Sequence, residues 1–450
     1  MVKTNRAEET MEHLFEQLGS ALIAQLDGQE SLALSFAAEN SQFMRFNSSR
    51  IRQSGMVDDI VLTLELIDCQ RQASASLSLS GNPDTDLLRA GAELSRLRRE
   101  VKELPQDPYL VLPVAGQFSH SVQRGKLLSP AQSAEKLLPA MQGLDLSGLW
   151  SSGRLYQGHI NSAGSRHWFA NDSYVLDYSL VNADESMLKA SFAGTDWQQS
   201  PYEQSLQASA QQLKMLQRPA IRIKPGHYRA YIAAAGVADL LDMFSWHGLS
   251  ESAMQTGESA FLRMRSEGVT LSPLFSLAED FSSGLVPRFN QSGEMAPERI
   301  DLISSGELKH CLTSSRTATE FALQSSFADD SEALQLPVMA AGTLADDDIL
   351  QALGTGVYLS NLHYLNWSDV AAGRITGMTR YACFWVENGE IQGPLETMRF
   401  DDSFYHFFGE NLEAVGSVSL NNPNVGTYGG RELGMTQCPG VLLSSFALTL

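Results

Sequence analysis

Long apolar runs are missing from this sequence of 450 residues, and their absence argues against a membrane protein. A helix that spans a bilayer needs about 18 or more consecutive apolar residues. The longest apolar segments, 230–241 and 441–450, are shorter and are interrupted by polar residues. The N-terminal segment MVKTNRAEETMEHLFEQL carries charges where a signal peptide needs an apolar centre. We therefore expect neither a membrane span nor export, and the sequence predicts a cytoplasmic protein.

Cysteine and basic residues are also scarce. The four cysteines lie far apart, at Cys69, Cys311, Cys383 and Cys438, with no Cys-x-x-Cys spacing. In a reducing compartment such residues are free thiols, most of them buried. Lysine and arginine number 32 against 52 aspartate and glutamate residues, a formal net charge of −20. Such a surface repels phosphate backbones, and the densest basic stretch, 94–102, fits a solvated helix face, so we expect no nucleic-acid partner.

The residues that are present are typical of a folded protein with more than one domain. Apolar residues make up 43% and charged residues 19% of the chain, which is long enough for two or three domains. Apolar residues recur at helical spacing over 7–27 and again over 84–104, where Asp84 or Thr85 is the expected N-cap. Between these helices, period-two alternation over 31–68 predicts strands. The pattern indicates a layer of helices on one face of a sheet.

A second, β-rich region begins near residue 220. One helix is predicted within it, at about 234–250, because apolar residues form a stripe at helical spacing. That stripe consists of Val237, Leu240, Leu241 and Phe244. We predict an α+β fold with two domains: an α/β layered domain over 1–215, and a mostly antiparallel, barrel-like β domain over 216–450 that carries the helix.

Several stretches of the sequence resemble the TldD/PmbA family. The most specific is RITGMTRYACFWVENGEIQGPLETMRFDDS at 374–403, with a Gly-rich approach, a strand that ends in Glu-Asn-Gly-Glu-Ile and a Pro-led strand. The others are RFNQSGEMAPERIDLISSGELKHCLTSSRTA at 288–318, LLDMFSWHGLSE at 240–251 and SQFMRFNSSRIRQSGMVDD at 41–59. The resemblance therefore touches both halves of the chain. It implies the same two-domain architecture and association in pairs.

The resemblance also implies an expected site. One branch of the family carries His-Glu-x-x-x-His on the helix and a cysteine near the C-terminus as a zinc peptidase site, whereas the other branch lacks this motif and serves as its partner. In this sequence Asp242 stands at the first His, Met243 at the Glu base and His247 at the second His, preceded by the bulky Trp246. The expected cysteine falls near 424–434, where none occurs, and Cys438 lies about ten residues further on.

These substitutions predict that the zinc site is lost. A hydrolytic zinc needs about three protein ligands and a general base, and methionine supplies neither. A spacing of five residues also rotates two side chains by about 140° on an ideal helix. We therefore expect no cofactor, with His247 and Asp242 as weak zinc candidates. His247 is expected to be a partly buried histidine at the helix end, and Asp242 a solvated or capping carboxylate.

Other candidate residues lie in the C-terminal half. His363, Tyr364, Asn366 and Trp367 belong to a strand that either lines a peptide groove or joins the core and a turn. Arg380 and Glu387 flank the next apolar strand, in which Cys383 is expected to be inert.

Two further motifs lead to no site. His159 and His167 bracket a predicted hairpin turn, and no third ligand accompanies them, so they are expected to be surface or core residues. No phosphate-binding loop or nucleophile-elbow motif occurs in a convincing context.

The leading hypothesis is a metal-poor partner or paralogue of a cytosolic zinc peptidase that holds extended or unfolded peptides. It would form a homodimer, or a heterodimer with a family member that carries the His-Glu-x-x-x-His motif. One alternative is an active metallopeptidase with a rearranged zinc site built on Asp242, His247 and a third ligand. The other is a non-proteolytic protein that binds a peptide or a small molecule.

Overall fold

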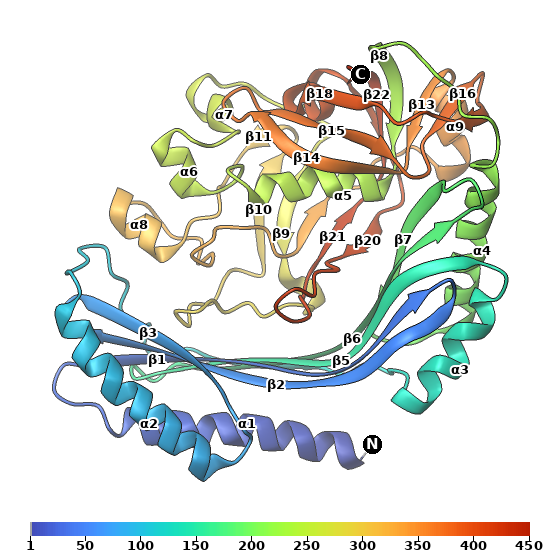
Figure 1. Cartoon of the computed structure of the whole chain (residues 1–450). Helices are drawn as coiled ribbons and strands as arrows, with labels where there is room; N and C mark the ends of the chain where they lie inside the picture. Colours follow the sequence, from blue (N-terminus) through green and yellow to red (C-terminus); the bar gives the residue numbers. More distant parts are fainter. Residues whose placement is uncertain (1) are drawn as a thin grey trace.

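The computed structural model describes residues 2–450, and the chain is α+β, as predicted. A long curved sheet forms the N-terminal half, and helices cover its outer face (Figure 1). The C-terminal half, built around two further sheets, lies over the opposite, concave face of the curved sheet (Figure 1). No helix of residues 2–450 is both long enough and apolar enough to cross a bilayer.

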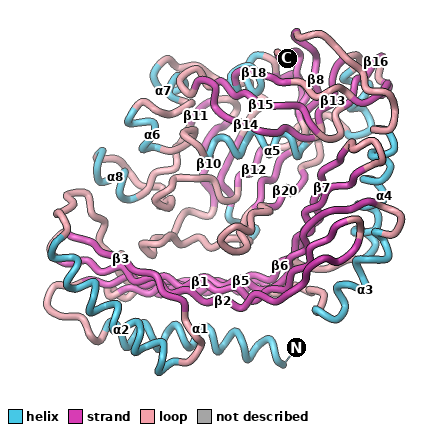
Figure 2. The backbone as a smooth tube through the Cα atoms, viewed as in Figure 1, coloured by secondary structure: helices cyan, strands magenta, loops and turns pink. Residues whose placement is uncertain are grey.

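The N-terminal sheet has seven strands in the order β3-β2-β1-β5-β6-β4, with β7 also paired to β6. All of its pairs are antiparallel except β4 with β6. Its strands are β1 (Ser31–Asn47), β2 (Arg50–Asp68), β3 (Arg71–Ser78), β4 (Phe118–Gln123), β5 (Asp145–Asn161), β6 (Arg166–Val181) and β7 (Met187–Gly194). Four of them, β1, β2, β5 and β6, have 16 to 19 residues, about three times the usual length of a strand. They run without interruption along the N-terminal half of the molecule (Figure 2).

Two pairs of helices cover separate cores behind this sheet. The helices are α1 (Val2–Ile23), α2 (Pro83–Glu100), α3 (Pro130–Met141) and α4 (Gln199–Met215). The helices α1 and α2 pack on one end of the sheet, and α3 and α4 pack on the other. The N-cap of α2 is Asn82, whose Oδ1 accepts a 3.1 Å hydrogen bond from the Thr85 amide. The expected cap at Asp84 or Thr85 is wrong, because Pro83 already occupies the first helical turn.

The C-terminal half contains a six-stranded and a nine-stranded sheet. The six-stranded order is β11-β10-β9-β12-β21-β20, and the nine-stranded order is β14-β15-β18-β22-β8-β13-β16-β17, with β19 paired to β22. The strands of the first sheet are β9 (Leu277–Asp280), β10 (Arg299–Ser304), β11 (Glu307–Leu308), β12 (Pro337–Met339), β20 (Leu420–Pro423) and β21 (Met435–Cys438). Those of the second are β8 (Gly226–Ile232), β13 (Gly356–Leu359), β14 (Asn361–Asp369), β15 (Arg374–Arg380), β16 (Phe384–Glu387), β17 (Glu390–Pro394), β18 (Arg399–Ser403), β19 (Leu412–Val415) and β22 (Val441–Leu448).

Helix α5 (Ala234–Asp242) is buried between these sheets and the cavity described below. Its predicted apolar stripe is confirmed, since Val237, Leu240, Leu241 and Phe244 are each at most 1% exposed. Four short helices follow it along the chain: α6 (Glu251–Thr256), α7 (Leu262–Ser266), α8 (Ser315–Phe321) and α9 (Ile349–Leu353).

The helix expected at about 234–250 ends earlier than predicted. After Asp242 the chain makes a 3-10 turn over 243–245, and His247 then adopts a left-handed φ of 57°. The Leu249 amide turns back to the Phe244 carbonyl at 3.1 Å. Gly248 permits this turn, because a Cβ at that position would lie 2.4 Å from the Phe244 carbonyl oxygen.

Candidate functional site

A cavity of about 1490 Å³ lies between the concave face of the N-terminal sheet and the C-terminal half. Strands β1, β2, β5, β6 and β7 and helix α4 contribute its N-terminal walls. Helix α5, strand β14 and the loops around β12, β20 and β21 contribute the opposite walls. Sites for single small molecules are usually 300–1,000 Å³, so this cavity has room for a longer ligand such as a peptide.

Helix α5 presents two carboxylates to the cavity. Asp239 and Asp242 are three residues apart, which places them on the same helix face. The Asp239 side chain accepts a 3.0 Å hydrogen bond from the Leu362 amide. Burial raises the pKa of Asp239 to about 7, although this hydrogen bond and the charge of Lys189 oppose the shift. The cavity walls partly shield Asp242 from bulk water. This burial raises the pKa of Asp242, and the negative charge of Glu432 raises it further.

Lys189 brings a positive charge to these carboxylates from the N-terminal side. It lies on β7 opposite Ser179, and the cavity residue Asp177 is two positions further along β6 on the same face. Burial raises the pKa of Asp177, and the charge of Lys189 counteracts the rise. Acids and a base from both halves of the chain therefore meet at this end of the cavity.

His363 is the predicted groove residue that lines the cavity. Its ring lies 4.2 Å from that of Tyr364 and 5.7 Å from that of Tyr381. Burial lowers the pKa of His363, and the charges of Arg380 and Lys189 lower it further. Tyr364 and Tyr381 have left-handed φ values of 52° and 68°. Aromatic residues rarely adopt this conformation, and such strain is concentrated at functional sites.

The other predicted groove residues lie outside the cavity lining. Asn366 accepts a 2.8 Å hydrogen bond from the Trp367 amide, and the Trp367 indole donates to the Trp246 carbonyl at 2.7 Å. The Arg380 guanidinium lies 5.6 Å from the centre of the Tyr381 ring. Glu387 accepts a 2.8 Å hydrogen bond from the Trp385 indole. Of the residues predicted from this strand and its neighbour, the structure therefore brings His363 to the cavity and adds Tyr381, which the sequence did not single out.

The three residues at the positions of the family's metal motif lie in different environments. Asp242 lines the cavity, whereas Met243 is 3% exposed in the apolar core. His247 is exposed beyond the end of the helix and does not line the cavity. Its expected partial burial is wrong, because the helix stops at the 3-10 turn before reaching it. A rearranged zinc site that uses both Asp242 and His247 is not supported by this geometry.

Cysteine does not complete a metal site either. The Cys438 thiol is buried beneath α5, donates to the Ala234 carbonyl at 3.2 Å and has a pKa that burial raises to about 12. Cys383 is likewise buried, with a pKa of about 11. Across residues 2–450, no three His, Cys, Asp or Glu side chains are grouped so that they could hold a metal ion. These residues do not fit the catalytic zinc that the family resemblance implies.

His159 lines one end of the cavity, and His167 lies beside it on the neighbouring strand. They face each other across β5 and β6, with ring centres 6.1 Å apart, and both are buried. The Phe289 ring stacks on His167 at 5.0 Å, and the Gly293 carbonyl lies 3.0 Å from the His167 Nε2 atom. Burial lowers the pKa of both histidines, that of His159 to about 3. The two rings thus form a neutral platform on which a C-terminal loop packs.

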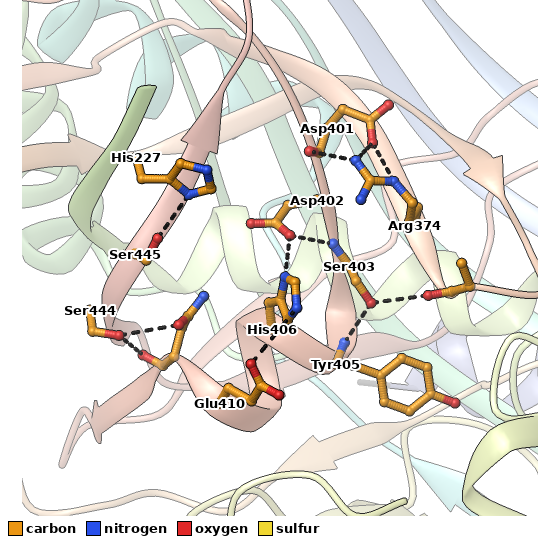
Figure 3. Close-up of polar contacts among 12 residues, drawn as sticks. His227, Arg374, Asp401, Asp402, Ser403, Tyr405, His406, Glu410, Ser444 and Ser445 are labelled. Atoms are coloured by element: carbon orange, nitrogen blue, oxygen red, sulfur yellow. Dashed lines mark hydrogen bonds and ion pairs between the residues drawn. The ribbon is translucent and has the colours of Figure 1, made fainter. Parts of the chain in front are cut away.

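A second polar cluster lies outside the cavity lining, around residues 401–410 (Figure 3). Asp402 is 3% exposed, and its Oδ1 lies 2.7 Å from the His406 Nδ1 atom. The same oxygen accepts a 2.7 Å hydrogen bond from the Ser403 amide. Arg374 pairs with the adjacent Asp401 at 2.6 Å. These contacts hold the turn after β18, so the cavity is the stronger candidate site.

A sequence model described as the PmbA/TldA metallopeptidase C-terminal domain matches residues 225–449. The chain belongs to the TldD/PmbA family. No curated protein sequence matches it significantly.

Three solved structures share the fold. A Thermotoga maritima protein described as a candidate modulator of DNA gyrase has a TM-score of 0.77 and 14% identity, covering 97% of this chain and 100% of its own. TldE from Thermococcus kodakarensis has the same four values. A candidate DNA gyrase modulator from Bacteroides thetaiotaomicron has a TM-score of 0.76 and 14% identity, covering 97% and 98%. At this identity the three structures establish the fold and leave the activity open.

Proposed function

We propose that this protein is a metal-poor member of the TldD/PmbA family that holds extended or unfolded peptide segments in its cavity. In this role it is the partner or paralogue of a cytoplasmic zinc peptidase and takes part in proteolysis or peptide maturation. The observation that supports this proposal most directly is the cavity of about 1490 Å³, which is walled by both halves of the chain and in which the described residues form no zinc donor set.

The chemistry of the walls suits a polypeptide. The cavity is lined by carboxylates, a lysine and amide side chains as well as by alanine, valine and leucine, so both polar main-chain groups and apolar side chains can be accommodated. Strand β14 ends the nine-stranded sheet, and its residues 361–363 reach the cavity wall. Pockets beside extended strands are a common means of holding peptides of varied sequence.

The proposal separates binding from cleavage. Met243 occupies the position of the family's general base and is buried in the core, where it can take no proton. Association with a second family member that carries the His-Glu-x-x-x-His motif would supply the missing chemistry. Co-purification of such a chain with the tagged protein, together with peptidase activity found in the pair and absent from either chain alone, is the expected result.

A cavity-filling substitution tests the binding role. Ala208 lies on α4, is exposed and lines the cavity, so Ala208→Trp would fill space without disturbing the core. Gln207→Trp is a matched control, because Gln207 is exposed on the same helix and does not line the cavity. Fluorescence anisotropy with labelled unfolded peptides should show at least tenfold weaker binding for Ala208→Trp and wild-type binding for Gln207→Trp. Equal binding by both variants would place the peptide site elsewhere.

A further inference from the structure

A loop from the C-terminal half reaches to the N-terminal sheet (Figure 1), and several of its residues line the cavity. It comprises residues 424–434, between β20 and β21, and is named the strap below. Four of its eleven residues are glycines. Its base is closed by a 3.1 Å hydrogen bond from the Asn424 amide to the Gly434 carbonyl, and its middle by one of 3.2 Å from the Glu432 amide to the Gly426 carbonyl. The strap is therefore a defined hairpin loop whose conformation depends on glycine.

Arg431 fastens the tip of the strap to three strands of the sheet. Its guanidinium donates hydrogen bonds to Ser41 Oγ on β1 at 3.0 Å and to the Gly153 carbonyl on β5 at 3.3 Å. It also donates to Ser173 on β6, to Oγ at 2.8 Å and to the carbonyl at 3.0 Å. The Arg431 amide donates to the Glu39 carboxylate at 3.0 Å. A charged donor with this many acceptors is a strong and specific attachment point.

The attachment point lies, along the strands, between two parts of the cavity. Cavity residues 157–159 of β5 lie at least four positions beyond Gly153. Asp177, another cavity residue, pairs with Leu149, four positions on the other side of Gly153. At about 3.3 Å per residue, the nearest residue of each group is therefore about 13 Å from the anchor along the strands. Strap residues 431–434 themselves line the cavity between these two groups.

The two parts have different walls. One is bounded by β1 and β2, by His159 and by the loop at 286–291. The other is bounded by Asp177, Lys189, α4, α5 and His363. A single extended segment of about four residues spans about 13 Å and fits within either part. A segment of about ten residues spans about 33 Å and meets the strap.

We propose that the strap is an autoinhibitory cross-tie, which limits the protein to short peptide segments until Arg431 leaves the N-terminal sheet. This inference depends on the proposed peptide-binding function and names the class of peptide that the cavity takes. Long unfolded segments bind by displacing the strap, and they must break the Arg431 hydrogen bonds to do so. Short segments bind without moving it.

The deciding measurement is how the affinity of the protein for a peptide depends on the length of that peptide. Labelled unfolded peptides of four and ten residues are titrated by anisotropy against wild type, Arg431→Ala and Arg222→Ala. Arg222 is a matched control, since its side chain is 85% exposed, does not line the cavity and forms a loose 3.7 Å ion pair with Glu396. Arg431→Ala should bind the ten-residue peptide at least tenfold more tightly than wild type does and should leave the four-residue affinity within twofold. Arg222→Ala should match wild type at both lengths.

The possible failures are distinguishable. If Arg431→Ala changes both lengths by the same factor, or changes neither, the cross-tie proposal is overturned while peptide binding stands. If no peptide of either length binds any of the proteins, the peptide-binding function itself fails, and the cross-tie proposal fails with it.

A measurement without ligand checks the attachment separately. Hydrogen exchange of amides in 424–434 should be at least tenfold faster in Arg431→Ala, and unchanged exchange there would overturn the proposal. The double variant Ser41→Ala with Ser173→Ala removes two acceptors from the sheet and leaves the strap intact. It should shift the ten-residue affinity in the same direction by a smaller factor, which keeps the test valid if Arg431→Ala folds poorly.

Discussion

The Asp239 carboxylate accepts a 3.0 Å hydrogen bond from the backbone amide of Leu362, which joins helix α5 to strand β14 at the wall of the cavity. The same carboxyl group has a pKa of about 7 because it is buried. The contact therefore combines a structural role with a proton that is exchanged near neutral pH.

Replacing Asp239 by Asn should remove a pH-dependent loss of stability. The folded-state pKa of about 7 lies above the ordinary aspartate value of 3.8, so the folded protein holds this proton more tightly than the unfolded chain does. Stability from this site is therefore lost as the pH rises from about 4 to about 7, by at most on the order of 4 kcal/mol. Urea unfolding should show that the unfolding free energy of Asp239→Asn rises relative to that of wild type over that interval. Above about pH 7 the difference between the two proteins should stay constant. A constant difference from pH 4.5 to pH 8 would contradict the assignment.

Substituting Met243 by Ala should destabilise the fold, because the residue at the family's base position is part of the core. Its side chain is 3% exposed and packs in the large C-terminal cluster. Removing a buried side chain of this size costs about 2–5 kcal/mol. Denaturant unfolding should show that loss for Met243→Ala. The neighbouring Trp246 is 53% exposed, so Trp246→Ala should change the unfolding free energy by less than about 1 kcal/mol.

Thiol labelling of the native protein should modify a single cysteine. Cys69 is exposed, whereas Cys311, Cys383 and Cys438 are buried. The hydrogen bond to Asp68 raises the pKa of Cys69, so its reaction with a thiol reagent should be slower than that of a free thiol at the same pH. One equivalent should react in buffer and four in denaturant. In Cys69→Ser the equivalent that reacts in buffer should be missing, and fast labelling of that variant would show that a second thiol is accessible.

Replacing His159 by Gln should reduce the sensitivity of the fold to acid. Burial lowers the folded-state pKa of His159 to about 3, below the ordinary histidine value of 6.5. Its neutral form therefore stabilises the fold above pH 6.5, and this contribution is lost as the pH falls towards 3. Between pH 7 and pH 5 the loss is on the order of 2 kcal/mol. Unfolding at both pH values should show a smaller decline for His159→Gln, and the exposed His310→Gln should follow wild type.

Local patterns in the sequence predicted much of the fold. Alternation over residues 31–68 predicted strands, and the structure has β1 and β2 there, turning at Ser48 and Ser49. The apolar stripe of α5 was also predicted, because the helical spacing of Val237, Leu240 and Leu241 indicates that one helix face is buried. The end of that helix was not predicted, since it depends on a turn that packs Gly248 against Phe244.

The candidate site was predicted less completely. Asp242 and His363 were named in advance, and both line the cavity. Lys189, Asp239 and Tyr381 were not, because they line one cavity only once the two halves of the chain face each other, which no local pattern encodes. The resemblance directed attention to 424–434 as the place for a thiolate ligand. In the structure this segment carries Arg431, whose partners lie about 260 to 390 positions away in sequence.

The floor of the cavity is made of strands that pass under both of its parts without a break. Such a sheet bends as one unit, because its strands have no hinge at the middle. A change in its curvature alters the width at both ends together. The outer helices α1 and α3, which pack on opposite ends of this sheet, are therefore positions from which the width of the cavity can be altered at a distance.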